Sequence, residues 1–334
     1  MPDIELKTLH LTTPFRIAHG VSSTRQVVRV HDDDAVGEAP FVPYYGEDVE
    51  ATVAWLRGVK DVAAALPAGA PRAGGLALDL LNLDRECRSA GVPLSAQVPH
   101  DLSRRSGRIP ACRSFSIPTD LQAFAELVTE TARQFQVLKL KLGCGDGEYD
   151  EQIVATARRM APEAQLLADV NGGWSVAVAA EMIPRLGKYG MALIEQPIHH
   201  AGGVAAWREL RAALPAEVTP LFADESAQTH EDVALLKGLV EGVNVKLLKC
   251  GSFAGAITMI EAARAHGLGV ILGCMIESSI GVTAAAHLAP WADWVDLDGH
   301  LYLADDDYTG LTFDADGCVI MPERSGIGAV LKAS

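Results

Sequence analysis

Basic side chains are scarce in this sequence. Its 334 residues contain 28 lysines and arginines against 43 aspartates and glutamates, which gives a formal net charge of −15 at pH 7. A protein that binds the nucleic-acid backbone needs a clustered basic surface, and anionic membranes attract basic segments. The sequence has no basic stripe, so we expect neither nucleic acid nor membrane as a partner.

Long apolar runs and paired cysteines are also missing. The sequence has no stretch of about 18 uninterrupted apolar residues, which argues against a transmembrane helix. Its first 13 residues carry two acids and no apolar segment, so we expect no signal peptide. The six cysteines are scattered and form no C-x-x-C pair, which disfavours both a disulfide scaffold and structural zinc. We therefore expect a reduced, soluble protein of the cytoplasm.

What the sequence does contain is a regular alternation of apolar runs and helical patterns. Hydrophobic residues make up 49% of a chain long enough for a large core. We expect strands at 137–141, 165–169, 192–195, 221–224, 243–246, 270–274 and 294–296, with helices between them. Seven or eight such units favour an α/β fold, a modified TIM (β/α) barrel. An open doubly wound sheet is the alternative, but the glycines at 143–147 lack its G-x-G-x-x-G spacing.

The first third of the chain follows a different pattern. Short strands are expected at 6–11, 27–31 and 35–37, followed by helices at 48–65 and 75–90, which together make an α+β unit. The tail resembles neither a barrel unit nor a disordered end. We therefore predict two domains: an α+β domain at 1–113, to which 312–334 returns, and a barrel at 114–311.

Charged residues end most of the predicted barrel strands. They are Lys139 and Lys141, Asp169, Glu195, Asp224, Lys246, and Asp296 with Asp298. Side chains alternate along a strand, so three acids at successive strand ends converge on one point of a barrel mouth. Three unpaired carboxylates would repel one another, and a hard divalent cation relieves this repulsion. Ligands that are all oxygens favour Mg²⁺, or Mn²⁺, over Zn²⁺.

Two lysines on opposite sides of such a metal suggest proton transfer. A neutral lysine removes a proton next to a carboxylate, and the ammonium group of the other returns one to the opposite face. The metal would hold the carboxylate and stabilise the enolate formed between the two steps. We expect burial and neighbouring cations to lower a lysine pKa towards the operating pH. The pattern predicts a 1,1-proton transfer.

At this point the sequence resembles the enolase superfamily, and within it the muconate-lactonising subgroup. The matching segments are LKLKLG (138–143), ADVNGGW (168–174), IEQP (194–197), FADES (222–226) and NVKLLKCGS (244–252). The resemblance implies that the α+β unit caps the barrel. It implies that Asp169, Glu195 and Asp224 bind Mg²⁺, that Lys141 and Lys246 are the acid/base catalysts, and that Lys139 assists the substrate carboxylate. We expect Lys249, three positions beyond Lys246, to be a surface lysine.

The last predicted strand suggests the substrate. Its DLDG segment (296–299) is similar to the D-x-D motif of family members that act on dipeptides, where two carboxylates hold the free ammonium group. The resemblance thus implies an isomerase, a Mg²⁺-dependent dipeptide epimerase that inverts the α-carbon of the C-terminal residue of an L,L-dipeptide. An o-succinylbenzoate synthase or a muconate cycloisomerase is the alternative enzyme. A catalytically silent barrel that binds metal or peptide is a further one.

Two segments depart from the family pattern. Members that act on Ala-Glu often carry an arginine in the first capping loop, where this chain has His19 and Gly20, which argues against a glutamyl substrate. We interpret the acidic run Asp305–Asp307 as a solvated loop. A homo-oligomer is the expected assembly, since symmetric homo-oligomers are common.

Overall fold

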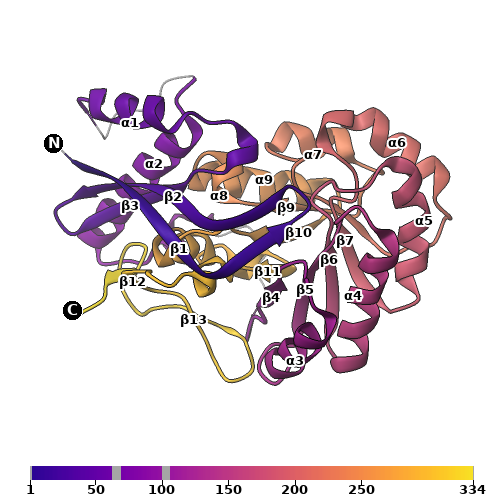
Figure 1. Ribbon diagram of the computed structural model, residues 1–334. Coiled ribbons are helices and arrows are strands. Elements are labelled where there is room, and N and C mark those ends of the chain that lie inside the picture. Colours follow the sequence, from indigo (N-terminus) through magenta and orange to yellow (C-terminus); the bar gives the residue numbers. More distant parts are fainter. Residues whose placement is uncertain (1, 62–68, 100–105, 334) are drawn as a thin grey trace.

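The core of the molecule is a barrel of eight parallel strands. The computed structural model describes residues 2–61, 69–99 and 106–333 (Figure 1). The strands are β4 (Cys112–Phe115), β5 (Val137–Lys141), β6 (Gln165–Asp169), β7 (Met191–Glu195), β8 (Leu221–Ala223), β9 (Gly242–Val245), β10 (Gly269–Gly273) and β11 (Trp294–Asp296). They pair in sequence order, all in parallel, and a bridge between Ala111 and Val295 joins the last strand to the first. The predicted barrel is confirmed, and the open sheet is wrong.

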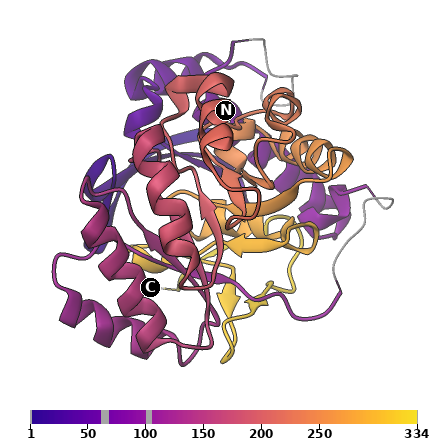
Figure 2. The same cartoon turned by 90° about the vertical axis from the view of Figure 1, so that its right-hand side faces the viewer.

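Helices follow the strands and cover the outside of the barrel. They are α3 (Leu121–Thr131), α4 (Gly147–Met160), α5 (Val176–Gly187), α6 (Gly203–Ala213), α7 (His230–Leu236), α8 (Leu247–Cys250), α9 (Phe253–Ala265) and α10 (Ser279–Ala286). Figure 2 shows several of them side by side in front of the strands. Five begin at a side chain that accepts hydrogen bonds from the first turn: Asp120, Asp146, Ser175, Ser252 and Ser278. These caps fix where each loop at the barrel mouth ends.

The N-terminal unit is a three-stranded antiparallel sheet packed on a helix. Its strands are β1 (Asp3–Ile17), β2 (Gly20–Asp32) and β3 (Ala35–Pro40), followed by α1 (Val49–Gly58) and α2 (Arg72–Ala90). In Figure 1 the indigo hairpin of β1 and β2 reaches from this unit towards the barrel strands. Both strands are longer than the sequence predicted. Their outer halves are mostly exposed, so the ladder there continues without the apolar alternation that marks a half-buried strand.

The C-terminal tail lies against the N-terminal unit. Its short strands pair as β12 (Tyr308–Thr309) with β15 (Val330–Leu331) and as β13 (Thr312–Phe313) with β14 (Val319–Ile320). The backbone N–H of Ile327 donates to Asp84 Oδ1 of α2 at 2.6 Å, and Gly326 exchanges backbone hydrogen bonds with Val92 and Leu94. The tail also touches the barrel side through a bridge between Pro110 and Cys318. The domain boundaries stay a prediction.

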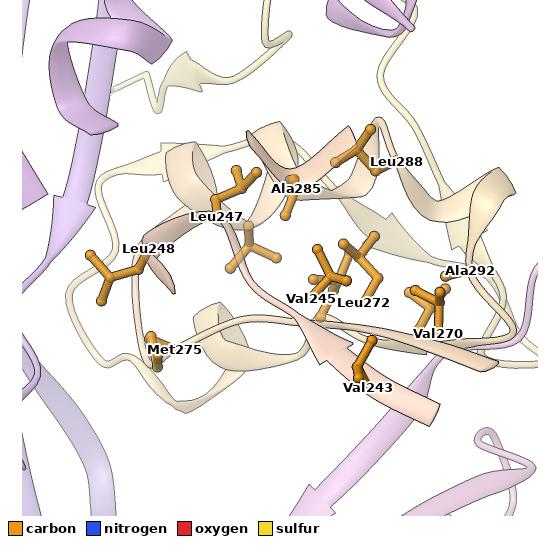
Figure 3. Close-up of a cluster of buried hydrophobic side chains, with 14 of the residues drawn as sticks. Val243, Val245, Leu247, Leu248, Val270, Leu272, Met275, Ala285, Leu288 and Ala292 are labelled. Atoms are coloured by element: carbon orange, nitrogen blue, oxygen red, sulfur yellow. The ribbon is translucent and has the colours of Figure 1, made fainter. Parts of the chain in front are cut away.

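Side chains alternate along the barrel strands, and those that point away from the barrel interior form the core beneath the helices. Val243 and Val245 of β9 and Val270 and Leu272 of β10 are fully buried, and Figure 3 shows Val245 and Leu272 on the side of the strands that faces Ala285 and Leu288. Each such burial stabilises the fold by about 1.5–3 kcal/mol. The intervening residues face the barrel interior. Within the described ranges no helix has the length and hydropathy needed to cross a membrane.

Candidate active site

The barrel interior is arranged in layers. Its apolar floor consists of Cys112, Val137, Leu167, Leu193, Phe222 and Ile271. Because inward side chains recur every second residue, the position two residues beyond Leu167 is Asp169, that beyond Leu193 is Glu195, and that beyond Phe222 is Asp224. All three carboxylates are fully buried above the floor. The strand pattern therefore brings the three predicted metal ligands together.

The three carboxylates fit a divalent cation. One oxygen from each of Asp169, Glu195 and Asp224 lies within 4.8 Å of the other two. Burial, and next the charge of Asp169, raises the pKa of Glu195 to about 7. Burial also acts to raise the pKa of Asp169, but Lys141 and Lys139 lower it to about 2. A buried donor set made only of carboxylate oxygens is the chemistry that Mg²⁺ prefers. These residues therefore fit the metal that the sequence predicted.

Two loops after the ligand strands are held in conformations that L-residues rarely adopt. Asn171 has φ +47° and Gln196 has φ +39°. The buried amide of Gln196 accepts from the backbone N–H of Asp224 at 2.9 Å and from that of Ser226 at 3.1 Å. The backbone N–H of Asn171 donates to Asp169 Oδ1 at 3.0 Å. These bonds fix the ligand-bearing strand ends, and strain of this kind accumulates at functional sites.

The two proposed catalytic lysines stand on opposite sides of the carboxylates. Lys141 ends β5 and Lys246 follows β9, four strands away around the eight-stranded barrel. The Lys141 ammonium lies 2.5 Å from Asp169 Oδ2, and that of Lys246 lies 2.7 Å from Asp224 Oδ2. Gly273 leaves space for Lys246, because a Cβ there would lie 3.0 Å from its Cε. The two ammonium groups therefore flank the point where the carboxylates meet.

The pKa of Lys246 differs from the expectation. Burial acts to lower it, but Asp224, followed by Tyr45 and Tyr44, raises it well above its ordinary value. The carboxylate in direct contact therefore outweighs desolvation. The sequence argument considered neighbouring cations and missed that this lysine touches an acid.

Lys139 lies deeper than its partner on the same strand. It is 1% exposed, and its ammonium lies 2.6 Å from Asp296, 2.8 Å from Glu195 and 3.2 Å from Asp169. Burial acts to lower its pKa, but Asp296 and the other carboxylates raise it well above its ordinary value. The side chain connects the metal-ligand cluster to the last strand.

Lys249 is buried, and the expectation of a surface lysine is wrong. Its ammonium donates to Asp224 Oδ1 at 2.6 Å and to the carbonyl oxygens of Asp224, Ala227 and Asn244. The short helix α8 begins directly after Lys246 and turns Lys249 back under the strand ends. The position three residues on thus returns to the same acid. A helical turn predicted directly after Lys246 would have indicated that Lys249 faces Asp224.

The aspartates of the last strand lie beside β4. Asp296 Oδ1 accepts from Ser114 Oγ at 2.9 Å and its Oδ2 from Lys139 at 2.6 Å. Asp298 Oδ2 accepts from the Ser114 backbone N–H at 2.7 Å and from Arg113 at 3.2 Å. Sequence reasoning did not find Arg113 or Ser114. The only signal was that Ser114 lies at an inward position of a strand that pairs with β5.

A cavity lies over these groups. Lys141, Lys246, Asp296 and Asp298 line it from the barrel, and the cap contributes a mostly apolar wall of Phe15, Ile17, Val42 and Tyr44. The cavity's polar groups converge at one end and its apolar groups lie at the other, as is typical of small-molecule sites. The cap and the barrel therefore enclose one site between them.

Two further side chains define the cap side of the mouth. His19 lies at the turn between β1 and β2, with its ring 4.9 Å from that of Tyr44 and 6.2 Å from that of His199. Arg25 also lines the cavity, where its Nε is buried without a partner and its Nη1 donates to the Phe41 carbonyl at 3.3 Å. Within the described residues Arg25 forms no ion pair. Arg25 follows the loop at 15–24 on which the argument against a glutamyl substrate rests, and the side-chain preference stays a prediction.

The acidic run after the barrel is not a solvated loop. Asp305 binds His10, Asp306 accepts from Ser279 Oγ at 2.6 Å, and Asp307 pairs with Lys7 and Arg29. These contacts join the segment to β1, β2 and the start of α10. The sequence pattern alone could not show partners that lie almost the whole chain away.

Comparisons with known proteins agree with the geometry. The family described as "Enolase C-terminal domain-like" matches residues 123–334. A hydrophobic dipeptide epimerase from Roseobacter litoralis is 35% identical, over 77% of this chain and 73% of the relative. An L-Lys-D/L-Arg epimerase from Methylococcus capsulatus is 31% identical over 98% of both chains.

Solved structures give the same result. The substrate-liganded L-Ala-D/L-Glu epimerase from Bacillus subtilis superposes with a TM-score of 0.85 at 25% identity, covering 100% of this chain and 99% of the other. A dipeptide epimerase from Methylococcus capsulatus, complexed with Mg and L-Arg-D-Lys, has a TM-score of 0.83 at 29% identity over 99% of both chains. With the barrel, the carboxylate cluster and the family match together, the chain belongs to the enolase superfamily.

Proposed function

We propose that the protein is a Mg²⁺-dependent dipeptide epimerase, which inverts the α-carbon of the C-terminal residue of an L,L-dipeptide. One observation supports this most directly. Two lysines approach a three-carboxylate cluster from opposite sides, and two aspartates lie in the same cavity. The similar proteins named above include dipeptide epimerases over nearly their full length.

Asp169, Glu195 and Asp224 would hold the metal. A divalent cation there supplies positive charge that binds the substrate carboxylate and favours loss of the neighbouring proton. Asp296 and Asp298 would receive the ammonium group of the dipeptide through charge-assisted hydrogen bonds. The substrate is then fixed at both ends, which places its α-carbon between the two lysines.

Lys141 and Lys246 would exchange protons with the two faces of the α-carbon. One lysine, entering as the neutral amine, takes the proton and becomes an ammonium group. The other, entering as ammonium, donates a proton to the opposite face and becomes neutral. One C–H bond breaks and one forms, so the product differs from the substrate only in configuration. The cap residues over the cavity exclude water from the site.

The test is proton exchange in D₂O. Purified enzyme with Mg²⁺ is incubated with L,L-dipeptides that carry apolar, basic or acidic C-terminal side chains, and NMR follows the α-proton. We expect its signal to disappear while the D-epimer forms. If no dipeptide exchanges its α-proton, the proposal is wrong.

Asp298→Asn separates the epimerase from the alternative enzymes. We expect turnover of dipeptides to fall at least about tenfold, because one charge of the proposed ammonium site is lost. A muconate cycloisomerase or an o-succinylbenzoate synthase acts on substrates without an amine and would keep its activity. Unchanged dipeptide turnover in this variant would contradict the ammonium site.

We also propose domain boundaries at 113/114 and 311/312, a cytoplasmic location and assembly as a homo-oligomer. The fit of six free cysteines to a reducing compartment supports the location. Light scattering coupled to size-exclusion chromatography measures the assembly, and a monomeric mass would contradict it.

A further inference from the structure

Asp298 is held on one side only. Its Oδ2 accepts from the Ser114 backbone N–H at 2.7 Å and from Arg113 Nη1 at 3.2 Å, and the Tyr302 hydroxyl lies 2.6 Å away. Within the described residues no protein donor occupies Oδ1. Asp298 also lines the cavity. One oxygen is thus fixed by the protein, and the other is left for a ligand.

Arg113 reaches Asp298 from outside the cavity. Along β4, Ser114 points into the barrel and the preceding Arg113 points to the opposite side, as the alternation of a strand requires. Its guanidinium lies 4.3 Å from the centre of the Tyr302 ring. Arg113 is absent from the cavity lining that the structure describes. It therefore acts through Asp298 and does not touch the substrate.

Tyr302 completes the support. It lies in the 3₁₀ turn η5 (Gly299–Tyr302) that follows the last barrel strand. Its hydroxyl is 2.6 Å from Asp298 Oδ2 and 2.5 Å from the Ser114 carbonyl oxygen. The single phenol proton serves one of these acceptors at a time. The ring is in turn covered by the arginine, so Arg113, Tyr302 and Asp298 form one packed unit.

Each aspartate of the last strand has its own cation. Asp296 is paired with Lys139, and Asp298 with Arg113. Burial raises the pKa of Asp298, Arg113 acts to lower it, and Asp296 adds to the rise. The other titratable groups around this unit are Lys141 of β5, whose charge acts on Asp296, Cys112 of β4, Cys274 directly after β10, and His300 of η5. Among these groups Arg113 is the cation paired with Asp298.

We propose that Arg113 is a positioning residue for substrate binding, which with Tyr302 keeps Asp298 ionised and turned so that Oδ1 receives the substrate's ammonium group. This inference rests on the proposed function. Arg113 and Tyr302, which support Asp298, are not part of the D-x-D pattern. The ligand class of the subsite is a primary ammonium group.

The experiment compares four proteins: wild type, Arg113→Gln, Arg113→Lys and Arg133→Gln. Arg133 pairs with Glu130 on the surface and serves as the matched control. KM and kcat for a free-amine dipeptide are measured with Mg²⁺ between pH 6.0 and 7.5, below the usual pKa of an α-amino group. Thermal unfolding verifies that each variant is folded.

We expect Arg113→Gln to raise KM about tenfold at pH 7, with kcat within about twofold of wild type, because the proton-transferring lysines are untouched. Without the arginine, Asp298 binds a proton more readily. Its charge is therefore lost as pH falls, and KM should rise further towards pH 6. Wild type and Arg133→Gln should show a flat KM over this range. Arg113→Lys should restore most of the affinity.

An N-acetylated dipeptide separates positioning from a general structural defect. It lacks the ammonium group, so its KM should be the same in wild type and Arg113→Gln. If KM for the free-amine dipeptide is unchanged in Arg113→Gln, or if kcat falls instead, the inference is wrong while the epimerase function stands. If wild type exchanges no dipeptide at all, the proposed function fails and the inference fails with it.

Discussion

Two clusters of buried charge in this molecule contain similar residues in different arrangements. In the cap, Arg29 is paired with Glu38 at 2.7 Å and Asp307 at 2.9 Å, and Glu38 also accepts two hydrogen bonds from Ser278. At the barrel mouth, three carboxylates share their lysines. Burial raises the pKa of Glu38 in the cap and of Glu195 at the mouth, so the two clusters are alike in that respect.

The difference lies in what each cluster faces. The cap cluster joins β2, β3, the start of α10 and the acidic segment 305–307, and its arginine is 1% exposed. The mouth cluster lies below a cavity. Removing one partner in the cap leaves a buried charge alone, whereas removing Glu195 at the mouth relieves its repulsion with Asp169. The first arrangement stabilises the fold, and the second preserves charge for a ligand at a cost in stability.

The largest expected effect is on chemistry at the mouth. Lys141→Ala should reduce α-proton exchange by about 10²–10⁴-fold, the usual contribution of a general acid or base. Circular dichroism verifies that the variant is folded. Lys188→Ala, at an exposed lysine paired with Glu151, is the control and should exchange at the wild-type rate. Exchange that persists in Lys141→Ala would exclude this residue as a catalyst.

A substitution in the cap cluster should lower stability and leave activity unchanged. Glu38→Gln leaves Arg29 without its fully buried partner and should lower the free energy of unfolding by about 3–5 kcal/mol in urea titrations. Activity per folded molecule should remain. Glu5→Gln is the matched control, because Glu5 is a 43% exposed acid 3.6 Å from the same arginine, and should cost less than about 1 kcal/mol. Equal losses in the two variants would remove the distinction between the clusters.

Metal should stabilise the mouth specifically. At a Mg²⁺ concentration 100 times its Kd, the free energy of unfolding should rise by about 2.7 kcal/mol, measured by calorimetry with and without chelator. Glu195→Gln should abolish this increase while leaving the metal-free protein at least as stable as wild type, because burial and the charge of Asp169 raise the pKa of Glu195. An equal increase in both proteins would mean that Mg²⁺ binds elsewhere.

The smallest effect is a pH dependence in the cap. Burial acts to raise the pKa of Asp307, but hydrogen bonds from Arg29 and Lys7 lower it to about 2. An unfolded aspartate has a pKa of about 3.9, so the stabilising contribution is complete above that pH and is lost as pH falls towards 2. The side chain is 34% exposed, so we expect only about 1 kcal/mol.

Asp307→Asn measures this contribution by comparison. The difference in unfolding free energy between this variant and wild type should be about 1 kcal/mol at pH 5 and smaller at pH 3. Asp34→Asn, in the exposed turn between β2 and β3, is the control and should show no such narrowing. A constant difference across this pH range would show that the ion pairs contribute nothing to stability.

The sequence predicted the barrel and most of the mouth because both depend on local patterns. Apolar runs marked β5 to β11, and alternation within β5 placed Lys139 and Lys141 on one face. β4 was missed because its four residues include a charged and a polar side chain. Arg113 and Asp298 are 185 positions apart, and only barrel closure brings them together. Lys249 depended on a single turn of helix that periodicity cannot detect.

The side-chain amide of Gln196 bears on how the substrate preference of such a protein can evolve. The Gln196 side chain connects the end of β7 to the end of β8. It accepts from the backbone N–H groups of Asp224 and Ser226 and donates to the Ile198 carbonyl and the Ser226 hydroxyl. This side chain therefore joins the loops that follow Glu195 and Asp224, two of the three acids predicted to bind metal. Within the described residues, no hydrogen bond joins the Gln196 amide to the hairpin of β1 and β2. Substitutions in that hairpin can therefore change the preference for the substrate side chain without displacing the acids at the barrel mouth.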